Sequence, residues 1–268
     1  MCPSEMTGRA DRAASAKATR EAPPDAFGRT AREYELGRPG WPEELLDQVI
    51  EELGLAPDAE VLDLGAGTGK LTRGLLPRFD RVVAVEPDDA MRAVLKEVVP
   101  RAEALSGRGE AIPLADGSVD AVFSAEAFHW FAGKESVAEI ARVLRPRGAL
   151  VILWNIPVEF AQLGDEAEAV IDEAFERGGV PGLPRVLSGE WRRPIEDGPF
   201  EELREAEVEC GVLNTRDEWI ANRLSVSSIA HQPDEDRAAF AGRLRELVPA
   251  DQEVRRRIRT VAHWTRRV

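Results

Sequence analysis

The sequence is poor in the residues that build disulfide frameworks and metal centres. Its 268 residues include two cysteines, Cys2 and Cys210, and three histidines. Two cysteines so far apart have neither the number that a disulfide scaffold needs nor the spacing of a zinc site. No group of His, Cys, Asp and Glu residues has the spacing of a metal-ligand set, so the sequence predicts no metal site.

Long apolar runs and positive net charge are also missing. No stretch approaches the roughly 20 apolar residues that cross a bilayer, and the N-terminus has no apolar segment typical of a signal peptide. The formal net charge of −14 repels phosphate backbones and anionic membranes. We therefore expect a cytoplasmic protein, monomeric or homodimeric, that acts on a small molecule and has no nucleic-acid or membrane partner.

Arginines nevertheless gather near the C-terminus. The favoured interpretation is the solvated face of a strand, where charge discourages edge pairing; the alternative is a basic docking patch. The residues concerned are Arg255, Arg256, Arg257, Arg259, Arg266 and Arg267.

The chain divides into a tail and one large domain. Residues 1–25 are rich in Ala, Arg, Ser and Pro, and offer too little apolar surface to offset chain entropy, so they are expected to be a disordered N-terminal tail. Residues 26–268 are expected to form a single domain, because this length supports one sizeable core.

Short apolar runs alternate with helical periodicity from Pro42 to Asn155. Such alternation predicts an α/β protein with a doubly wound, Rossmann-like sheet that is mostly parallel. Seven strands are expected, near residues 61–64, 82–85, 102–105, 119–124, 149–154, 206–212 and 259–264. After Asn155 the alternation stops, and residues 156–203 are predicted to be a lid insertion over the carboxyl edge of the sheet, with one helix over 159–178 and a loop over 179–200. Helices are expected near 216–230 and 234–247.

The strongest local motif is Asp63-Leu64-Gly65-Ala66-Gly67-Thr68-Gly69, between a strand and a helix. Gly65 and Gly67 permit tight backbone angles, and free N–H groups at the start of the helix are expected to favour a carboxylate or other anion. The phosphate-binding Walker A motif is excluded, because leucines occupy its first glycine and hydroxyl positions. The dinucleotide fingerprint lacks its third glycine, which is Lys70 here. Asp63 would repel a pyrophosphate but suits an ammonium group.

Glu86 ends the second predicted strand. This position is close to the offset of about 20 residues that is typical of an acid that binds a ribose. A carboxylate there can accept hydrogen bonds from both ribose hydroxyls. Together with Asp63, Glu86 predicts a ligand with both an ammonium group and a ribose.

At this point the sequence resembles the class I S-adenosylmethionine (SAM)-dependent methyltransferases, and more narrowly the small-molecule branch known as methyltransferase type 11. The resemblance rests on VLDLGAGTGKLT (61–72), VAVEPDDAM (83–91), GEAIPLADGSVD (109–120), AEAFHWF (125–131) and VLRPRGAL (143–150). YELGRPGWP (34–42) is similar to a segment of bacterial trans-aconitate methyltransferase-like proteins. The lid segment has no counterpart in the resemblance.

The resemblance implies SAM as cofactor and assigns roles to individual residues. Gly65 and Gly67 would line its methionine end, Asp63 would reach its amino group, and Glu86 would hold the ribose. An acid often stands where this chain has Arg108, which leaves the adenine contact to be rebuilt. The implied cofactor-binding set is Tyr34, Arg38, Asp63, Gly65, Ala66, Gly67, Glu86, Pro87, Glu110, Ala111 and Ala125.

The implied activity is methyl transfer from SAM to a carboxylate, hydroxyl or amine of a small molecule, with release of S-adenosylhomocysteine. An alternative is a SAM-binding regulatory or scaffold protein without transferase activity. His129 is the candidate catalytic residue: it is either a general base or part of an aromatic wall around the sulfonium. Arg38 is suited to the methionine carboxylate through its fork of donors.

Overall fold

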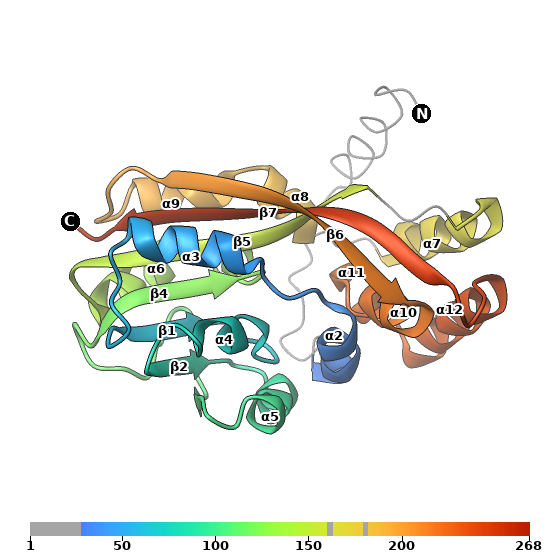
Figure 1. The fold of residues 1–268 in the computed structure, drawn as a ribbon, viewed down its shortest axis with the longest axis horizontal. Coiled ribbons are helices and arrows are strands. Elements are labelled where there is room, and N and C mark those ends of the chain that lie inside the picture. Colours follow the sequence, from blue (N-terminus) through green and yellow to red (C-terminus); the bar gives the residue numbers. More distant parts are fainter. Residues whose placement is uncertain (1–27, 160–162, 179–181) are drawn as a thin grey trace.

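One seven-stranded sheet organises the chain in the computed structural model, which describes residues 28–159, 163–178 and 182–268 (Figure 1). The strand order is β3-β2-β1-β4-β5-β7-β6. The pairs among β1, β2, β3, β4 and β5 are parallel, whereas β7 runs antiparallel to both neighbours. The predicted mostly parallel, Rossmann-like sheet is confirmed. The bounds are β1 Glu60–Leu64, β2 Arg81–Val85, β3 Glu103–Leu105, β4 Val119–Ala125, β5 Leu144–Glu159, β6 Arg204–Thr215 and β7 Glu253–Arg266. The predicted tail, 1–25, lies outside the described residues.

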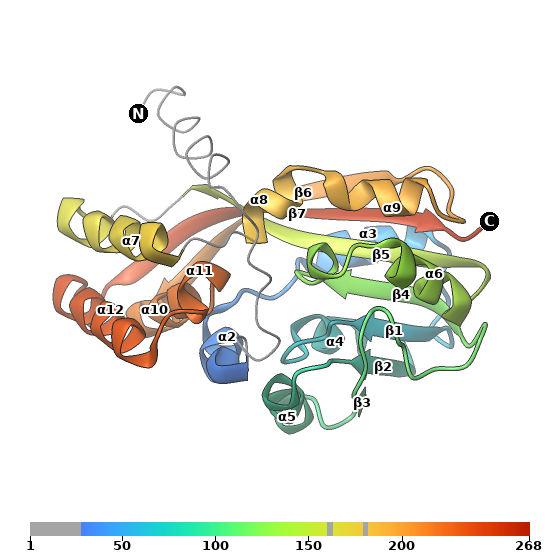
Figure 2. The same cartoon turned by 180° about the vertical axis from the view of Figure 1, so that it is seen from behind.

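Helices cover both faces of the sheet because successive side chains on a strand point to opposite faces. Val61, Val82 and Phe123 pack under α3 (Glu43–Glu52) and α4 (Lys70–Leu75). α5 (Asp89–Val98) packs through Leu95 on the same face. The other face packs against α6 (Lys134–Val143) and against α8 (Gly182–Leu187), η3 (Glu190–Arg192) and α9 (Arg193–Glu196) (Figures 1 and 2).

The segment predicted as a loop, 179–200, is largely helical in its described part. Trp191 and Ile195 are buried in the same core as α6 and β5. These helices are too short to give a periodic apolar pattern. The segment is also rich in Gly and Pro, a composition that is typical of loops. Pro194, for example, occupies the first turn of α9, where proline costs no hydrogen bond.

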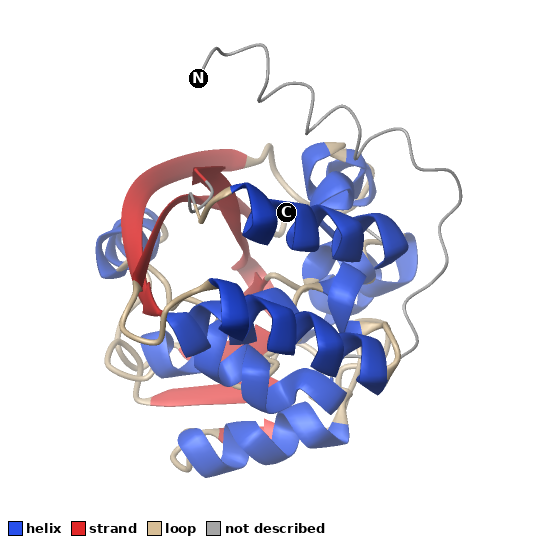
Figure 3. Cartoon of the chain, turned by 90° about the vertical axis from the view of Figure 1, so that its right-hand side faces the viewer, coloured by secondary structure: helices blue, strands red, loops and turns tan. Residues whose placement is uncertain are grey.

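A second group of helices stands beyond the carboxyl edge of the sheet. β5, β6 and β7 extend past the shorter strands and carry α7 (Asp165–Gly178), α10 (Arg216–Leu224), α11 (Ser227–Ala230) and α12 (Asp234–Leu247). These four helices share a core of their own, and we call them the helical cap; Figure 3 turns this end of the molecule toward the viewer. The helix predicted from 159 begins at Asp165, because the backbone as far as Glu159 remains paired with β7.

Three short helical elements were not predicted from the sequence. η1 (Gly28–Thr30) and α2 (Ala31–Gly37) precede the first predicted helix, and η2 (Phe128–Trp130) follows β4. In Figures 1 and 2, α2 lies beside α10 of the cap, below the carboxyl edge of the sheet. The structure thus places an N-terminal helix between the glycine loop and the cap.

The part played by residues 182–196 in the core gives a stability prediction. Ile195→Ala should lower the free energy of unfolding by about 2–5 kcal/mol, because its fully buried side chain leaves a cavity. Leu187→Ala, in the same segment but 55% exposed, should change it by less than about 0.5 kcal/mol. Urea unfolding followed by circular dichroism measures both. Equal, small effects would show that this segment does not belong to the core.

Candidate functional site

The glycine loop joins β1 to α4 through three glycines with left-handed backbone angles. The φ angles are 72° at Gly65, 57° at Gly67 and 86° at Gly69, a region that side chains disfavour. A Cβ atom at Gly65 would lie 2.6 Å from that of Ala127. Glycine is therefore required here both by backbone angle and by close approach.

Three N–H groups in the first part of this loop, ahead of the start of α4, are already paired within the protein. Those of Gly65 and Ala66 donate to the Val85 carbonyl, at 2.8 and 3.1 Å. The Gly67 N–H donates to Glu86 Oε2 at 2.8 Å. The Ala66 side chain packs against Ala84 and Leu95. These three N–H groups are therefore not donors for an anionic ligand group, and the expected anion site at the start of α4 stays a prediction.

Two buried carboxylates flank the loop. Asp63 accepts a hydrogen bond from Thr72 Oγ1 at 2.6 Å, and burial raises its pKa to about 7. Glu86 accepts from the Gly67 and Asp88 N–H groups, and burial raises its pKa too. Pro87, the next residue, is exposed. The structure thus brings together both acids that the sequence singled out.

Tyr34 and Arg38 reach the loop from α2. The Tyr34 ring edge lies 4.0 Å from where a Cβ of Gly67 would stand, and burial raises the tyrosine pKa to about 12. The Arg38 guanidinium stacks over this ring, 5.3 Å from its centroid. Its Nε donates to Ser225 Oγ at 3.0 Å, so Arg38 joins the loop side of the site to the cap.

Glu35 holds α2 on the glycine loop, a role that the sequence analysis missed. It accepts hydrogen bonds from Thr68 Oγ1 and Arg73, both at 2.7 Å, and lies 3.8 Å from Lys70 Nζ. Lys70, which occupies the third-glycine position of a dinucleotide fingerprint, is thus paired with an acid. Glu35 lies one residue after Tyr34 in the motif, and this adjacency was the available signal.

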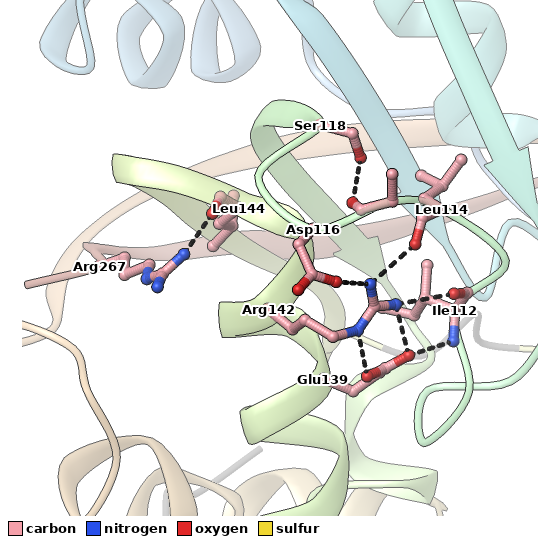
Figure 4. A network of polar contacts seen from close by, with 9 residues as sticks. Ile112, Leu114, Asp116, Ser118, Glu139, Arg142, Leu144 and Arg267 are labelled. Atoms are coloured by element: carbon pink, nitrogen blue, oxygen red, sulfur yellow. Dashed lines mark hydrogen bonds and ion pairs between the residues drawn. The ribbon is translucent and has the colours of Figure 1, made fainter.

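The loop after β3 carries Glu110 and Ala111, both exposed. It leaves the sheet beside Glu86, whose N–H donates to the Leu105 carbonyl. Arg142 of α6 fixes the loop by donating to the carbonyls of Ile112 and Leu114, at 3.0 and 2.9 Å (Figure 4). Glu139, whose pKa Arg142 lowers, accepts the Ile112 N–H at 2.8 Å. Arg108 is exposed and lies 4.0 Å from Glu110.

His129 lies in η2, within a group of aromatic rings. Its Nδ1 accepts the indole N–H of Trp154 at 3.2 Å, so a neutral ring carries its proton on Nε2. Burial lowers the His129 pKa to about 3. Trp130 packs on the histidine at 4.8 Å between ring centroids. The ring is therefore neutral at physiological pH and offers a donor rather than a base.

Glu126, which follows Ala125 at the end of β4, is the second residue that the sequence analysis missed. Its φ of 55° is unusual for a residue with a side chain. Its Oε1 accepts the Asn155 N–H at 2.7 Å, and burial raises its pKa against the opposing effect of Arg38. Glu126 shares a small pocket with Tyr34, Arg38, Pro39, Trp41, Lys70 and Asn155.

The described residues contain neither a candidate metal site nor a membrane-spanning helix. Within residues 28–159, 163–178 and 182–268, no group of three or more His, Cys, Asp or Glu residues could hold a metal ion. No helix in those same ranges is both long and apolar enough to span a membrane.

This sheet order, with its glycine turn after β1 and acid after β2, defines a class I methyltransferase. The family described as "Methyltransferase domain" matches residues 62–152. An uncharacterized methyltransferase of Mycobacterium tuberculosis is 39% identical over 223 residues, 83% of this chain and 85% of the relative. The chain belongs to this family and is a SAM-dependent methyltransferase.

The chain is also similar to a named O-methyltransferase over about half of its length and to a solved structure over most of its length. The malonyl-(acyl-carrier protein) O-methyltransferase of Methylococcus capsulatus is 35% identical over 153 residues, 55% of this chain and 52% of that protein. A solved structure from Anaeromyxobacter dehalogenans, assigned as a type II methyltransferase, has a TM-score of 0.58 at 23% identity, over 85% of this chain and 97% of that one. The latter supports the fold. The narrower similarity to trans-aconitate methyltransferase-like proteins stays a prediction.

The raised pKa of Asp63 predicts how ligand affinity depends on pH. A ligand ammonium favours the ionised carboxylate, so binding should require loss of a proton below pH 7. The affinity for S-adenosylhomocysteine should be level above pH 7 and fall by up to roughly tenfold per pH unit below it. Calorimetric titration between pH 5.5 and 8.5 measures this. Asp63→Asn should bind more weakly with no such pH dependence, and a flat wild-type profile would contradict the assignment.

Proposed function

We propose that the protein transfers the methyl group of SAM to a carboxylate, hydroxyl or amine of a small molecule and releases S-adenosylhomocysteine. The observation that carries this proposal is the pair of buried carboxylates, Asp63 and Glu86, on either side of the glycine turn. Both have raised pKa values, which suits carboxylates that await a cation or hydroxyl donors.

The residues around the turn fit the methionine end of SAM. Asp63 would hold the ammonium group. A small pocket is lined by Arg38, Lys70 and Trp41, which are donors suited to a carboxylate, and also by the acid Glu126. The buried indole N–H of Trp41 has no acceptor among the described residues. Side chains would therefore supply the carboxylate donors that the loop N–H groups cannot.

The ribose and adenine would extend from Glu86 along the loop after β3. Each Glu86 oxygen accepts one backbone N–H and retains capacity for a ribose hydroxyl. Ala111 and Glu110 would face the adenine, on a loop that Arg142 holds still. Arg108 points to solvent, so backbone groups would take the place of the acid that is common at that position.

The acceptor would approach from the side of β4 and β5, where Glu126, His129 and Asn155 lie. Bound SAM supplies a methyl group on a sulfonium, an electrophile that needs no covalent catalysis. Transfer of that methyl group would leave the carbon–sulfur electron pair on sulfur, and a hydroxyl or amine acceptor would also have to lose a proton. Glu126 is positioned to accept that proton, whereas neutral His129 would form part of the wall. The O-methyltransferase relative supports oxygen as the acceptor atom.

The cofactor site is tested by Gly67→Arg. The side chain would enter the space facing Tyr34 and should weaken S-adenosylhomocysteine binding at least 100-fold. Gly54→Arg is the matched control, since Gly54 has a similar φ of 56° but open space around it. Both variants should lose about 1–2 kcal/mol of stability to backbone strain, and only the first should lose binding. Unchanged affinity in Gly67→Arg, measured by calorimetry, would reject the cofactor site.

The activity itself is tested by incubating the protein with isotope-labelled SAM and panels of carboxylates, phenols and amines. Mass spectrometry should detect label in one acceptor, and Gly67→Arg should remove that signal. S-adenosylhomocysteine binding without any label transfer would favour the SAM-binding scaffold instead.

The role of His129 is tested by its titration. With a pKa of about 3, its ring resonances should not shift between pH 5 and 8 in nuclear magnetic resonance spectra. Only two other histidines, His231 and His263, contribute signals, and His129→Ala assigns the third. A titration midpoint between pH 6 and 7 would restore the histidine as the general base.

A further inference from the structure

Arg223 and Arg256, at the end of the sheet that carries the helical cap, have side chains directed into the protein. Arg256 lies on β7 between Val254 and Ile258, so the three side chains share the inner face of the strand. Arg223 lies on α10 one turn after Trp219 and Ile220, both buried. Arg223 is only 8% exposed. Arginine is seldom buried this deeply without a paired acid, so the arrangement requires an explanation.

Neutral groups are the only partners of these arginines among the described residues. Asn222 Oδ1 accepts from Arg223 Nη2 at 2.6 Å and from Arg256 Nη1 at 3.3 Å. Asn214 Oδ1 accepts from Arg256 Nε at 3.2 Å. Arg223 Nε and Arg256 Nη2 are buried without an acceptor in this part of the chain. Two donors, one from each guanidinium, are therefore left for a further group.

Both arginines also have lowered pKa values. Burial, and then the nearby charges of Arg256 and Arg38, lower the pKa of Arg223 to about 9. Burial and Arg38 lower the pKa of Arg256 to about 10. Like charges held together in a buried place raise the free energy of the protein unless an anion joins them. The arrangement is thus suited to bind an anion and costs stability without one.

The pair lies next to the proposed methyl-transfer site. Arg38, which stacks on Tyr34, donates to Ser225, two residues after Arg223. The charge of Arg38 lowers the pKa of His129 as well as those of the two arginines. Figures 1 and 2 show the same proximity, with α2 beside α10. Arg38 is therefore close enough to affect both His129, on the acceptor side of the site, and the arginine pair.

We propose that Arg223 and Arg256, with Asn222 between them, bind a carboxylate or phosphate group of the methyl acceptor, so that the acceptor is an anionic small molecule. This inference rests on the proposed function. The guanidinium fork matches both oxyanions, and two forks fix the orientation of the molecule that carries them. The bound anion would be the group by which the acceptor is recognised.

Arg237 shows what a buried structural arginine looks like in the same cap. It is also 8% exposed, but it forms ion pairs with Glu33 at 3.5 Å and Asp234 at 3.1 Å. The Glu33 pair ties α12 to α2, and the Asp234 pair lies within α12. The Nε of Arg237, like that of Arg223, is buried without an acceptor among the described residues, so the difference between the two arginines is the paired acids. Arg223 and Arg256 have no such acid among the described residues, and this contrast supplies a matched control.

Binding is tested by calorimetric titration of the full-length protein, saturated with S-adenosylhomocysteine, in low-chloride buffer. The probes are succinate, inorganic phosphate and neutral succinamide. Succinate or phosphate should bind and succinamide should not, and the tighter of the two identifies carboxylate or phosphate as the preferred group. Arg223→Gln and Arg256→Gln should each weaken anion binding at least tenfold and change S-adenosylhomocysteine affinity less than twofold.

The outcomes separate this inference from the function on which it rests. Failure of S-adenosylhomocysteine to bind would reject the proposed function. Normal binding of S-adenosylhomocysteine with no binding of either anion would reject the arginine site alone. An equal loss of S-adenosylhomocysteine affinity in both arginine variants would also reject it, because the pair would then serve the cofactor.

Unfolding without ligand gives a second, independent test. If the pair awaits an anion, Arg223→Met should leave the thermal midpoint unchanged or raise it, because a repelled buried charge is removed. Arg237→Met should lower the midpoint, because Glu33 and Asp234 lose their partner. A fall for Arg223→Met as large as that for Arg237→Met would show that Arg223 is structural and would overturn the proposal.

Discussion

The contact between Gly37 and Asn222 is the constraint on which both halves of the site depend. A Cβ at Gly37 would lie 2.0 Å from the Asn222 backbone nitrogen, so only glycine lets α2 approach α10 this closely. On one side of this contact, Glu35 holds α2 to the glycine loop. On the other side, Arg38 bonds to Ser225 and Asn222 bonds to the arginine pair. A small shift of α2 would therefore disturb cofactor and acceptor sites together.

The two acids proposed to bind the cofactor and the two arginines proposed to bind the acceptor lie on opposite sides of this contact. The acids Asp63 and Glu86 lie on the side of the glycine loop, and Arg223 and Arg256 lie on the side of the cap. Burial raises the pKa values of the two acids and lowers those of the two arginines. In each case burial favours the neutral form, so each charge costs free energy in the protein alone. A cationic amino group at the acids and an anionic acceptor at the arginines would offset both costs. The proposed binding groups therefore reduce the stability of the protein when no ligand is bound.

The sequence predicted what local pattern and chain order determine. β1, β2 and β4 are buried on both faces, so they appear as short apolar runs, and Asp63 and Glu86 follow from their positions at strand ends. The helices over 182–196 were missed because packing against the sheet, not periodicity, holds them. Glu126 was missed and Arg256 was wrongly assigned to a solvated face, because their partners are distant in sequence. Arg223 was missed because its burial depends on the packing of the cap, although its partner Asn222 is adjacent. Arg256 did leave a signal: it alternates with Val254 and Ile258, so it cannot share the solvated face assigned to the neighbouring arginines.

The glycine loop explains why a fold shared with nucleotide-binding proteins takes a different ligand here. In phosphate-binding loops the backbone N–H groups face the anion. In this chain the Val85 carbonyl and the Glu86 carboxylate accept those of Gly65, Ala66 and Gly67. A phosphate at the loop would find these donors taken and two buried acids nearby, which would repel it. The same acids attract an ammonium and a ribose, so the internal hydrogen bonds of the loop select against pyrophosphate before any side chain of the cap is involved.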